Sequence, residues 1–246
     1  VLPSESSLYI EGTVKLKKGG VEVPIINTTT VNLITNGISF MFNDIRYELN
    51  GVEIDRSRSL GFTSLMKSYA SFNDNIFKNA MNAGWSKSGI KLPNGEFNVC
   101  IPLKYLIGFA EDYNKILINA KHELILTRSS SDLNCVKISP ADYADNVEMS
   151  LSKVVWRVPH IKVSDEQRLR LMKYLENDTI ITSNFRSWDI YEYPTLPSTT
   201  NVVWTVKTTT QLEKPRYIIL ALQTDRKNHI EKDTSIFDHC NISNVR

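Results

Sequence analysis

The sequence predicts an all-β protein: an antiparallel β-sandwich with short inserted helices and one connector helix. Three observations lead to this prediction. Apolar and polar residues alternate over many short segments, as they do in half-buried strands. Turn-forming pairs such as Asn50-Gly51 separate these segments. Apolar residues at helical spacing are confined mainly to residues 60–84 and 165–176.

Composition sets the limits for this fold. The chain has 246 residues, of which 41% are hydrophobic and 23% charged, which is enough apolar content for a globular core. A net charge of +2 gives no support for a molecule-wide attraction to nucleic acid. No apolar run reaches the ~18 residues that a membrane-spanning helix needs. Three distant cysteines argue against a disulfide framework and favour a reducing compartment.

The first part of the chain is expected to form strands joined by tight turns. Residues 8–16 alternate in polarity and precede the turn signal Gly19-Gly20. Asn36-Gly37 is interpreted as a hairpin turn between a strand at 31–35 and a strand at 38–42.

The clearest hairpin spans residues 42–56. Apolar and polar residues alternate on both sides of Asn50-Gly51, and these two residue types tolerate the positive φ angles of a type I′ turn. The apolar phase shifts at Asn43-Asp44, which predicts a β-bulge at that point.

The next region changes to helical spacing. Residues 60–84 predict two short helices, with Asn73 as the N-cap of the second. Asn94-Gly95 is a third predicted hairpin turn. Pro102 is expected to begin a helical turn that ends at Gly108.

Strand signals then resume. Residues 116–118 and 123–126 predict strands, and the polar stretch 129–145 predicts a surface loop. Residues 147–158 predict one long strand, whose change of phase at Ser152-Lys153 indicates a bulge.

A connector helix is predicted at residues 165–176. It is preceded by Ser164, which forms a capping box with Gln167. Strands are expected again at 183–188, 202–207 and 217–222.

Chemistry-bearing motifs do not gather in this sequence, so we expect no catalytic, cofactor-binding or metal site. There is no nucleophile elbow, phosphate-binding loop or zinc-binding His pair. The histidines are scattered along the chain: His122, His160, His229 and His239. A sandwich hydrolase that uses Glu53 and Asp55, placed on one strand face, is the weakest of the alternatives.

A second alternative is a β-sandwich module that binds glycan or protein ligands. It would need an exposed aromatic platform, for which Trp85, Trp188 and Trp204 are the candidates. If all three are buried in the core, this alternative loses its support.

Two short basic runs are interpreted first as solvated faces. One comprises Lys15, Lys17 and Lys18, and the other Arg168, Arg170 and Lys173. The hypothesis that such a patch contacts nucleic acid predicts salt-sensitive binding.

Subunit-interface candidates lie in the C-terminal third. Trp, Tyr and Arg concentrate at interface hot spots, which favours Arg186, Trp188 and Tyr191. The alternative for this segment is a core strand that Trp188 anchors. Lys214 and Arg216 are further candidates.

Most of the chain, from residue 8 to 245, resembles a known protein family. It is similar to the double-jelly-roll major capsid proteins of Polinton-like elements and related adintoviruses, which are associated with insects. The most specific stretches are residues 46–55, 102–104 with 108–109, 121–126, 156–160, 185–189 and 211–216.

The resemblance implies two upright jelly rolls in tandem, homotrimers, an icosahedral shell and location in the virion after assembly inside the host cell. It implies minor capsid or penton proteins as partners, and non-specific contact with packaged DNA, but no catalytic residues. The expected division is an N-terminal jelly roll at 5–160, a connector at 161–200, and the first strands of a second, incomplete jelly roll at 201–246. Such proteins are normally much longer than this chain.

Overall fold

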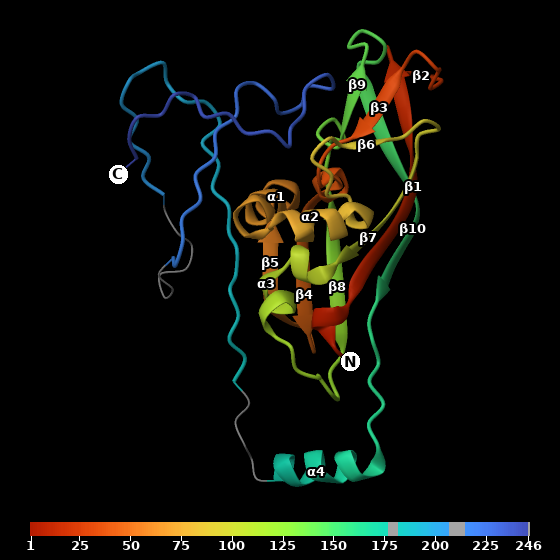
Figure 1. Cartoon of the computed structure of the whole chain (residues 1–246), viewed down its shortest axis with the longest axis vertical. Coiled ribbons are helices and arrows are strands. Elements are labelled where there is room, and N and C mark those ends of the chain that lie inside the picture. Colours follow the sequence, from red (N-terminus) through yellow and green to blue (C-terminus); the bar gives the residue numbers. More distant parts are fainter. Residues whose placement is uncertain (177–181, 207–214, 246) are drawn as a thin grey trace.

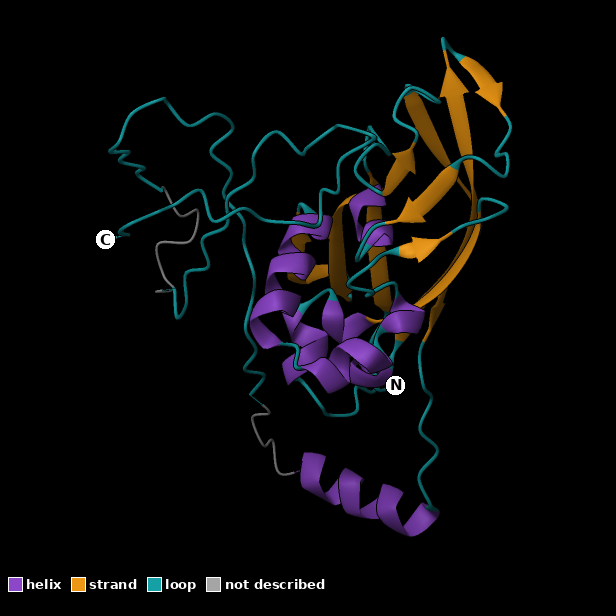
Figure 2. Cartoon of the chain, turned by 45° about the horizontal axis from the view of Figure 1, so that its top comes forward, coloured by secondary structure: helices purple, strands orange, loops and turns teal. Residues whose placement is uncertain are grey.

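The computed structural model describes residues 1–176, 182–206 and 215–245. Within these residues the strands form three antiparallel sheets, which confirms the predicted all-β class. Helices α1 to α3 gather beside the sheets, whereas α4 lies apart from them (Figures 1 and 2). The strands are β1 Ser7–Lys18, β2 Val21–Val23, β3 Thr30–Leu33, β4 Phe42–Leu49, β5 Val52–Arg58, β6 Ile90–Lys91, β7 Glu96–Pro102, β8 His122–Arg128, β9 Val136–Ser139 and β10 Asn146–Arg157. The α-helices are α1 Leu60–Ser71, α2 Asp74–Asn79, α3 Gly108–Asp112 and α4 Asp165–Glu176, and short 3₁₀ helices span Pro3–Glu5, Gly37–Met41, Met81–Ala83 and Leu103–Tyr105.

Strand β1 is the centre of the largest sheet. It pairs with β10 along one edge and with β7 and β2 along the other. Its residues alternate between buried and half-buried, as the sequence pattern predicted. Glu11 pairs with Lys153 and Gly12 with Leu151, so Ser152 is the extra residue of a bulge. The predicted bulge in β10 is therefore confirmed.

The other two sheets have three strands each. One has the order β6-β3-β9 and the other β5-β4-β8. The β4–β5 hairpin is confirmed, because Asn50 and Gly51 have φ angles of 52° and 78°. The predicted bulge at Asn43 is confirmed as well: Phe42 pairs with Arg128 and Asp44 with Thr127, which leaves Asn43 unpaired.

The helical region also follows the sequence prediction. Helix α1 ends at Ser71 and α2 begins after Asn73, whose Oδ1 accepts a hydrogen bond from the Ile76 backbone at 2.9 Å. Trp85, which is fully buried, packs edge-on to Tyr105 with ring centroids 5.4 Å apart. Both rings also pack on Phe72, which directly follows α1, so these aromatic contacts hold the end of α1 against the two 3₁₀ turns.

The core draws apolar side chains from all three sheets and from the helices. Its largest fully buried members are Leu8, Ile10, Leu16, Leu33, Ile34, Ile38, Met41, Ile45, Tyr47, Leu60, Trp85 and Phe109.

Three turn assignments need correction. Asn36-Gly37 does not join two paired strands: Asn36 has φ of 59° and precedes a 3₁₀ helix, Gly37–Met41, in which every residue is buried. Asn94-Gly95 is a turn, but it connects β6 and β7, which belong to different sheets. Gly108 begins α3 and does not end a helical turn.

One predicted strand and one predicted loop also differ from the structure. Residues 116–118 form no strand, because no neighbouring strand pairs with them. The expected surface loop 129–145 contains β9, which pairs with β3 through Val136 and Ile138, both buried. Four residues of alternation between polar flanks are a weak signal, which explains why this strand was missed.

Among the described residues beyond 160, α4 is the one helix, and the rest is irregular chain with turns. Helix α4 confirms the predicted connector helix, and the Gln167 backbone donates to Ser164 Oγ at 3.4 Å. The strands expected at 183–188, 202–207 and 217–222 are absent from the described residues, although residue 207 lies outside them. A strand needs a ladder of hydrogen bonds to a neighbour, and among the described residues these stretches have only isolated backbone contacts, such as the Asp238 N–H bond to the Leu222 carbonyl oxygen at 2.8 Å. The division into domains at 160 and 200 therefore stays a prediction.

No helix in the described parts of the chain is long and apolar enough to cross a membrane.

The crowding at Gly12 generates a stability prediction. A Cβ at this position would lie 2.3 Å from the Ser150 carbonyl oxygen and 2.6 Å from Phe97 Cζ. We expect Gly12→Ala to lower the free energy of unfolding by about 3 kcal/mol, because backbone must move to make room. Urea unfolding followed by tryptophan fluorescence measures this change.

The matched control is Gly51→Ala in the hairpin turn. Its Cβ would meet open space, so only the positive φ opposes it, at a cost of about 1 kcal/mol. Equal destabilisation by the two variants would contradict the described packing of β1 between β7 and β10.

Candidate functional site

The segment with most interface candidates, residues 184–191, lies on α3 and is here called the anchored segment. Arg186 forms a forked ion pair with Asp112 at the end of α3: Nε lies 2.9 Å from Oδ2 and Nη2 lies 2.6 Å from Oδ1. The Arg186 backbone N–H also donates to Asp112 Oδ2 at 2.8 Å. A bidentate pair of this kind fixes position as well as adding energy.

The surface below the anchored segment is shaped to receive it. A Cβ on Gly108 would lie 1.6 Å from the Arg186 carbonyl oxygen, so only glycine permits this approach. Phe185 packs edge-on to Phe109 with ring centroids 5.3 Å apart. The docked position is thus specified by residues of α3 as well as by the segment itself.

Charged groups lie buried beneath this contact. Lys67 of α1 is only 3% exposed, with its Nζ 2.7 Å from Glu111 Oε2 and 2.8 Å from the Lys104 carbonyl oxygen. The Phe109 backbone N–H donates to Asp55 Oδ2 at 2.8 Å. Trp188 covers the group, with its ring centroid 5.8 Å from Lys67 Nζ. Helix α1, strand β5 and α3 are therefore tied together at the point where the anchored segment lies.

Burial controls the proton affinities in this cluster. It lowers the pKa of Lys67, against the opposing effect of Glu111. It raises the pKa of Asp55, against the hydrogen bonds donated by backbone N–H groups such as that of Phe109. The Arg186 guanidinium holds the pKa of Asp112 below its ordinary value. These shifts accompany a structural ion-pair network.

The interface candidates have different surroundings. Arg186 is 45% exposed but its charge is paired within the chain. Trp188 is half-buried, and its indole Nε1 is buried without an acceptor among the described residues. The Tyr191 hydroxyl donates to Asp189 at 3.0 Å. Arg216 is exposed, and Lys214 lies outside the described residues. Arg186, Trp188 and Tyr191 thus lie in one segment but have different partners, and their contact with a second subunit stays a prediction.

A second segment, residues 227–235, contacts β9 and α1. The Ile138 backbone of β9 donates to the Ile230 carbonyl oxygen at 2.9 Å, and Ile230 is buried. The Tyr69 hydroxyl of α1 donates to the Ser235 carbonyl oxygen at 3.0 Å. Lys227 Nζ lies 2.7 Å from Glu192 Oε2, and Glu192 directly follows the anchored segment.

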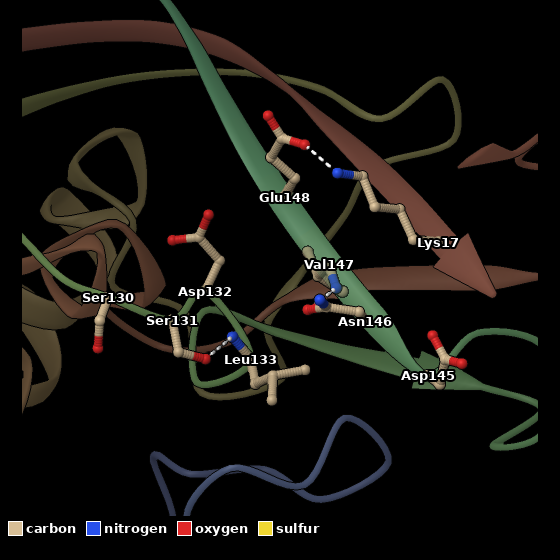
Figure 3. Close-up of a pocket in the computed structure, with 9 residues that line it drawn as sticks. All are labelled: Lys17, Ser130, Ser131, Asp132, Leu133, Asp145, Asn146, Val147 and Glu148. Carbon is tan, nitrogen blue, oxygen red and sulfur yellow. Dashed lines mark hydrogen bonds and ion pairs between the residues drawn. The ribbon is translucent and has the colours of Figure 1, made fainter. Parts of the chain in front are cut away.

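A surface recess of about 560 Å³ lies beside the start of β10 (Figure 3). Its charged groups are occupied. Lys17 pairs with Glu148 at 2.5 Å, Asp132 pairs with Arg128 at 2.6 Å, and Asp145 accepts a hydrogen bond from the Gly19 backbone at 2.8 Å. The cavity therefore has the character of a polar surface recess, and its side chains offer no nucleophile with an adjacent base.

The carboxylate pair of the hydrolase alternative is not formed. Glu53 is exposed and lies 3.7 Å from Arg46, whereas Asp55 is buried below α3. The reason is a bulge in β5: Glu48 pairs with Glu53 and Tyr47 with Asp55, which leaves Ile54 as an extra residue and changes the phase.

The three tryptophans proposed for an aromatic platform differ in exposure. Trp85 is in the core, Trp188 is half-buried, and Trp204 is 37% exposed and packs edge-on to Tyr193. Among residues 1–176, 182–206 and 215–245, no three His, Cys, Asp or Glu side chains gather as metal ligands.

Comparison with known proteins gives one result. A family model described as "double jelly roll-like domain" matches residues 31–246. A search of curated proteins gives no match to the chain.

The Arg186–Asp112 pair generates a prediction about the anchored segment. Arg186→Ala should raise the exchange rate of backbone amides at 184–191 by about fivefold, because the loss of a half-exposed bidentate pair costs about 1 kcal/mol. Hydrogen exchange read by mass spectrometry measures this. Arg216→Ala, which removes an exposed arginine outside the ion pairs described, is the control and should leave the segment unchanged. Unaltered exchange in Arg186→Ala would show that the Arg186–Asp112 pair does not hold the anchored segment in place.

The same pair predicts an acid-sensitive contact. The pKa of Asp112 is lowered in the folded state, so its contribution is complete above the ordinary aspartate value of about 4 and is lost as pH falls through the lowered pKa. Protection of 184–191 should therefore decline below about pH 4, and Asp112→Asn should remove this dependence. A decline of equal size in Asp112→Asn would show that another group is responsible.

Proposed function

This chain belongs to the double jelly roll-like domain family, and from that premise we propose that it is a structural viral capsid subunit. The fold type is typical of viral capsid proteins. The family match over residues 31–246 is the observation that carries the proposal. The three antiparallel sheets are consistent with a structural building block.

The finer assignment is to the capsid proteins of Polinton-like elements and adintoviruses. It rests on stretches of the sequence such as residues 46–55 and 185–189. In this proposal the chain forms homotrimers, the trimers form an icosahedral shell with minor capsid or penton proteins, and the protein resides in the virion after assembly inside the host cell.

The C-terminal residues support the proposed division into two jelly rolls. Val203 is 90% exposed, Tyr217 72% and Ile218 86%, in extended chain that pairs with no strand in the described parts of the protein. β-Branched and aromatic residues favour strands, and an exposed apolar extended segment favours pairing with added chain. We assign residues 5–160 to the first jelly roll, 161–200 to the connector and 201–246 to the start of the second.

Assembly of the purified protein tests the proposal. Sedimentation velocity and native mass spectrometry should give a species of three chains, with larger particles as concentration rises. A monomer at every salt concentration and pH would overturn the proposed function.

The interface candidates give a second prediction. Trp188→Ala should weaken the trimer at least about tenfold, because truncation of an interface tryptophan typically costs about 2 kcal/mol or more. Trp204→Ala is the control, since Trp204 is 37% exposed and lies outside the 184–191 segment. If both variants form trimers as the unmodified chain does, Trp188 is not an interface residue. If both weaken the trimer equally, the choice of the 184–191 segment is wrong.

A further inference from the structure

The chain leaves the body before it returns as the anchored segment. Strand β10 ends at Arg157, and the Pro159 carbonyl oxygen accepts a hydrogen bond from the Leu2 backbone at 3.1 Å. Figure 1 shows the chain running away from the sheets after β10, with α4 apart from α1 to α3. The chain between Pro159 and the anchored segment, residues 160–183, is here called the tether.

The described part of the tether is not packed on the body. All side chains described at residues 160–174, 176 and 182–183 are exposed. The hydrogen bonds described for Ser164, Gln167 and Arg170 are local, since each joins residues three or four positions apart. The location of the anchored segment therefore depends on the contacts that the segment makes itself.

These contacts are of the kind that one subunit makes with another. They include the bidentate Arg186–Asp112 pair and the edge-on packing of Phe185 on Phe109. No strand pairs with the segment among the described residues, whereas the body is built from paired strands and buried apolar side chains. Arginine ion pairs and aromatic anchors are enriched at protein–protein interfaces.

The receiving surface lies on one short helix. Gly108, Phe109 and Asp112 of α3 are here called the α3 site. Gly108 leaves room for the Arg186 carbonyl oxygen, and Asp112 binds the guanidinium of the same arginine. Every copy of the chain carries the same site and the same segment, so the site of one copy fits the segment of another equally well.

The tether is long enough to reach a neighbouring body. With α4 kept helical, residues 160–183 span at most about 60 Å. A globular body of about 160 residues has a radius of gyration of only about 15 Å. The α3 site of a body in contact with this one is therefore within reach over a range of orientations.

The α3 site has three possible occupants: the segment of its own chain, the segment of a second copy, and a segment of another protein. Another protein would have to reproduce the side chains of Phe185, Arg186 and Trp188 in the same order. The chain's own segment has the advantage of a high effective concentration, which the tether supplies. A neighbour held in an assembly supplies its segment at a similar effective concentration.

The residues that follow the anchored segment favour the second copy. Val203 is 90% exposed and Ile218 is 86% exposed when the segment lies on its own body. Clusters of exposed apolar side chains typically mark contacts with another protein surface. A segment that crosses to a neighbour brings these side chains to the boundary between two bodies, where they can be covered.

We propose that the α3 site binds the anchored segment of a second copy of this chain, so that neighbouring subunits exchange the segment. The exchange rests on the proposed function, because assembly supplies the neighbour. It deepens that function by naming a contact between subunits. The contacts of Arg186 with Asp112 and of Phe185 with Phe109 are then made across the subunit boundary.

Photo-cross-linking of the full chain tests the exchange. Phe185 is replaced by p-benzoylphenylalanine, whose excited ketone inserts into adjacent C–H bonds and so reports on the surroundings of Phe109. The protein is irradiated at a concentration at which sedimentation velocity shows assembly, and is then separated on a denaturing gel. We expect covalent species of two or more chains, in which mass spectrometry locates the link between position 185 and α3.

A second probe position guards against a poor fit of the larger side chain at 185. The ring of Trp188 lies 5.8 Å from Lys67 Nζ, so p-benzoylphenylalanine in place of Trp188 should link to α1 of a second chain. Gly108→Ala, introduced together with the probe at 185, should remove the link between chains. Its Cβ would lie 1.6 Å from the Arg186 carbonyl oxygen. Gly51→Ala, in an exposed turn, is the matched control and should leave the link unchanged.

Two variants with complementary defects give an independent test. Gly108→Ala blocks the site but keeps the segment, whereas Arg186→Glu keeps the site and places a carboxylate against Asp112. Each variant alone should assemble at least about tenfold more weakly, because the contact costs about 1.4 kcal/mol or more to lose. An equimolar mixture should assemble at a lower concentration than either variant alone, since unlike chains then share one intact contact.

Two results would overturn the exchange: cross-links that stay within single chains, and a mixture that assembles no better than its components. Trimers with links only within chains would leave the proposed function standing. Links between chains in a dimer without threefold units would support the exchange and contradict the proposed function. A monomer with links only within the chain would overturn both.

Discussion

The pairing of β1 with strands on both of its edges is the constraint on which the rest of the body depends. Its inward residues Leu8, Ile10, Val14 and Leu16 are at most 5% exposed, and each buried side chain of this size contributes about 1.5–3 kcal/mol. The bulge at Ser152 keeps the apolar side chains of β10 on the same side of the sheet as these residues. Leu16 pairs with Val147 and Leu8 with Trp156, so apolar residues of both halves of β10 lie on the same side as those of β1. Without the extra residue, one half would turn its apolar side chains to solvent.

Charge pairing divides the molecule into a body and its attachments. In the body, buried groups such as Lys67 and Asp55 have partners that offset their desolvation. The anchored segment uses the same means at the surface, through Arg186 and Asp112.

Local patterns in the sequence were sufficient wherever a structure depends on neighbouring residues. The hairpin at Asn50-Gly51, the N-cap at Asn73 and both bulges were predicted because turn chemistry and alternation are local. The 3₁₀ helix Gly37–Met41 was not, because a short run buried on all sides has no period that separates helix from strand. Expected strands near residues 116–118 and 217–222 are absent from the described structure, since a strand also depends on a neighbour that its own sequence does not specify.

The candidate site was less predictable still. Arg186 was chosen for its residue type, but its partner Asp112 is 74 residues away in the chain. The sequence predicts a helix end at Gly108. In the structure Gly108 begins α3, and its missing side chain permits the close approach of the Arg186 carbonyl oxygen. Composition can thus indicate a segment, while the surface that receives it comes from the tertiary fold.

Cryo-electron microscopy of particles assembled from the purified chain, alone or with any continuation that its reading frame encodes, tests the central claim most directly. The account predicts threefold capsomers in which the β1–β10 sheet stands upright relative to the particle surface. Discrete monomers, or an assembly without threefold units, would contradict it.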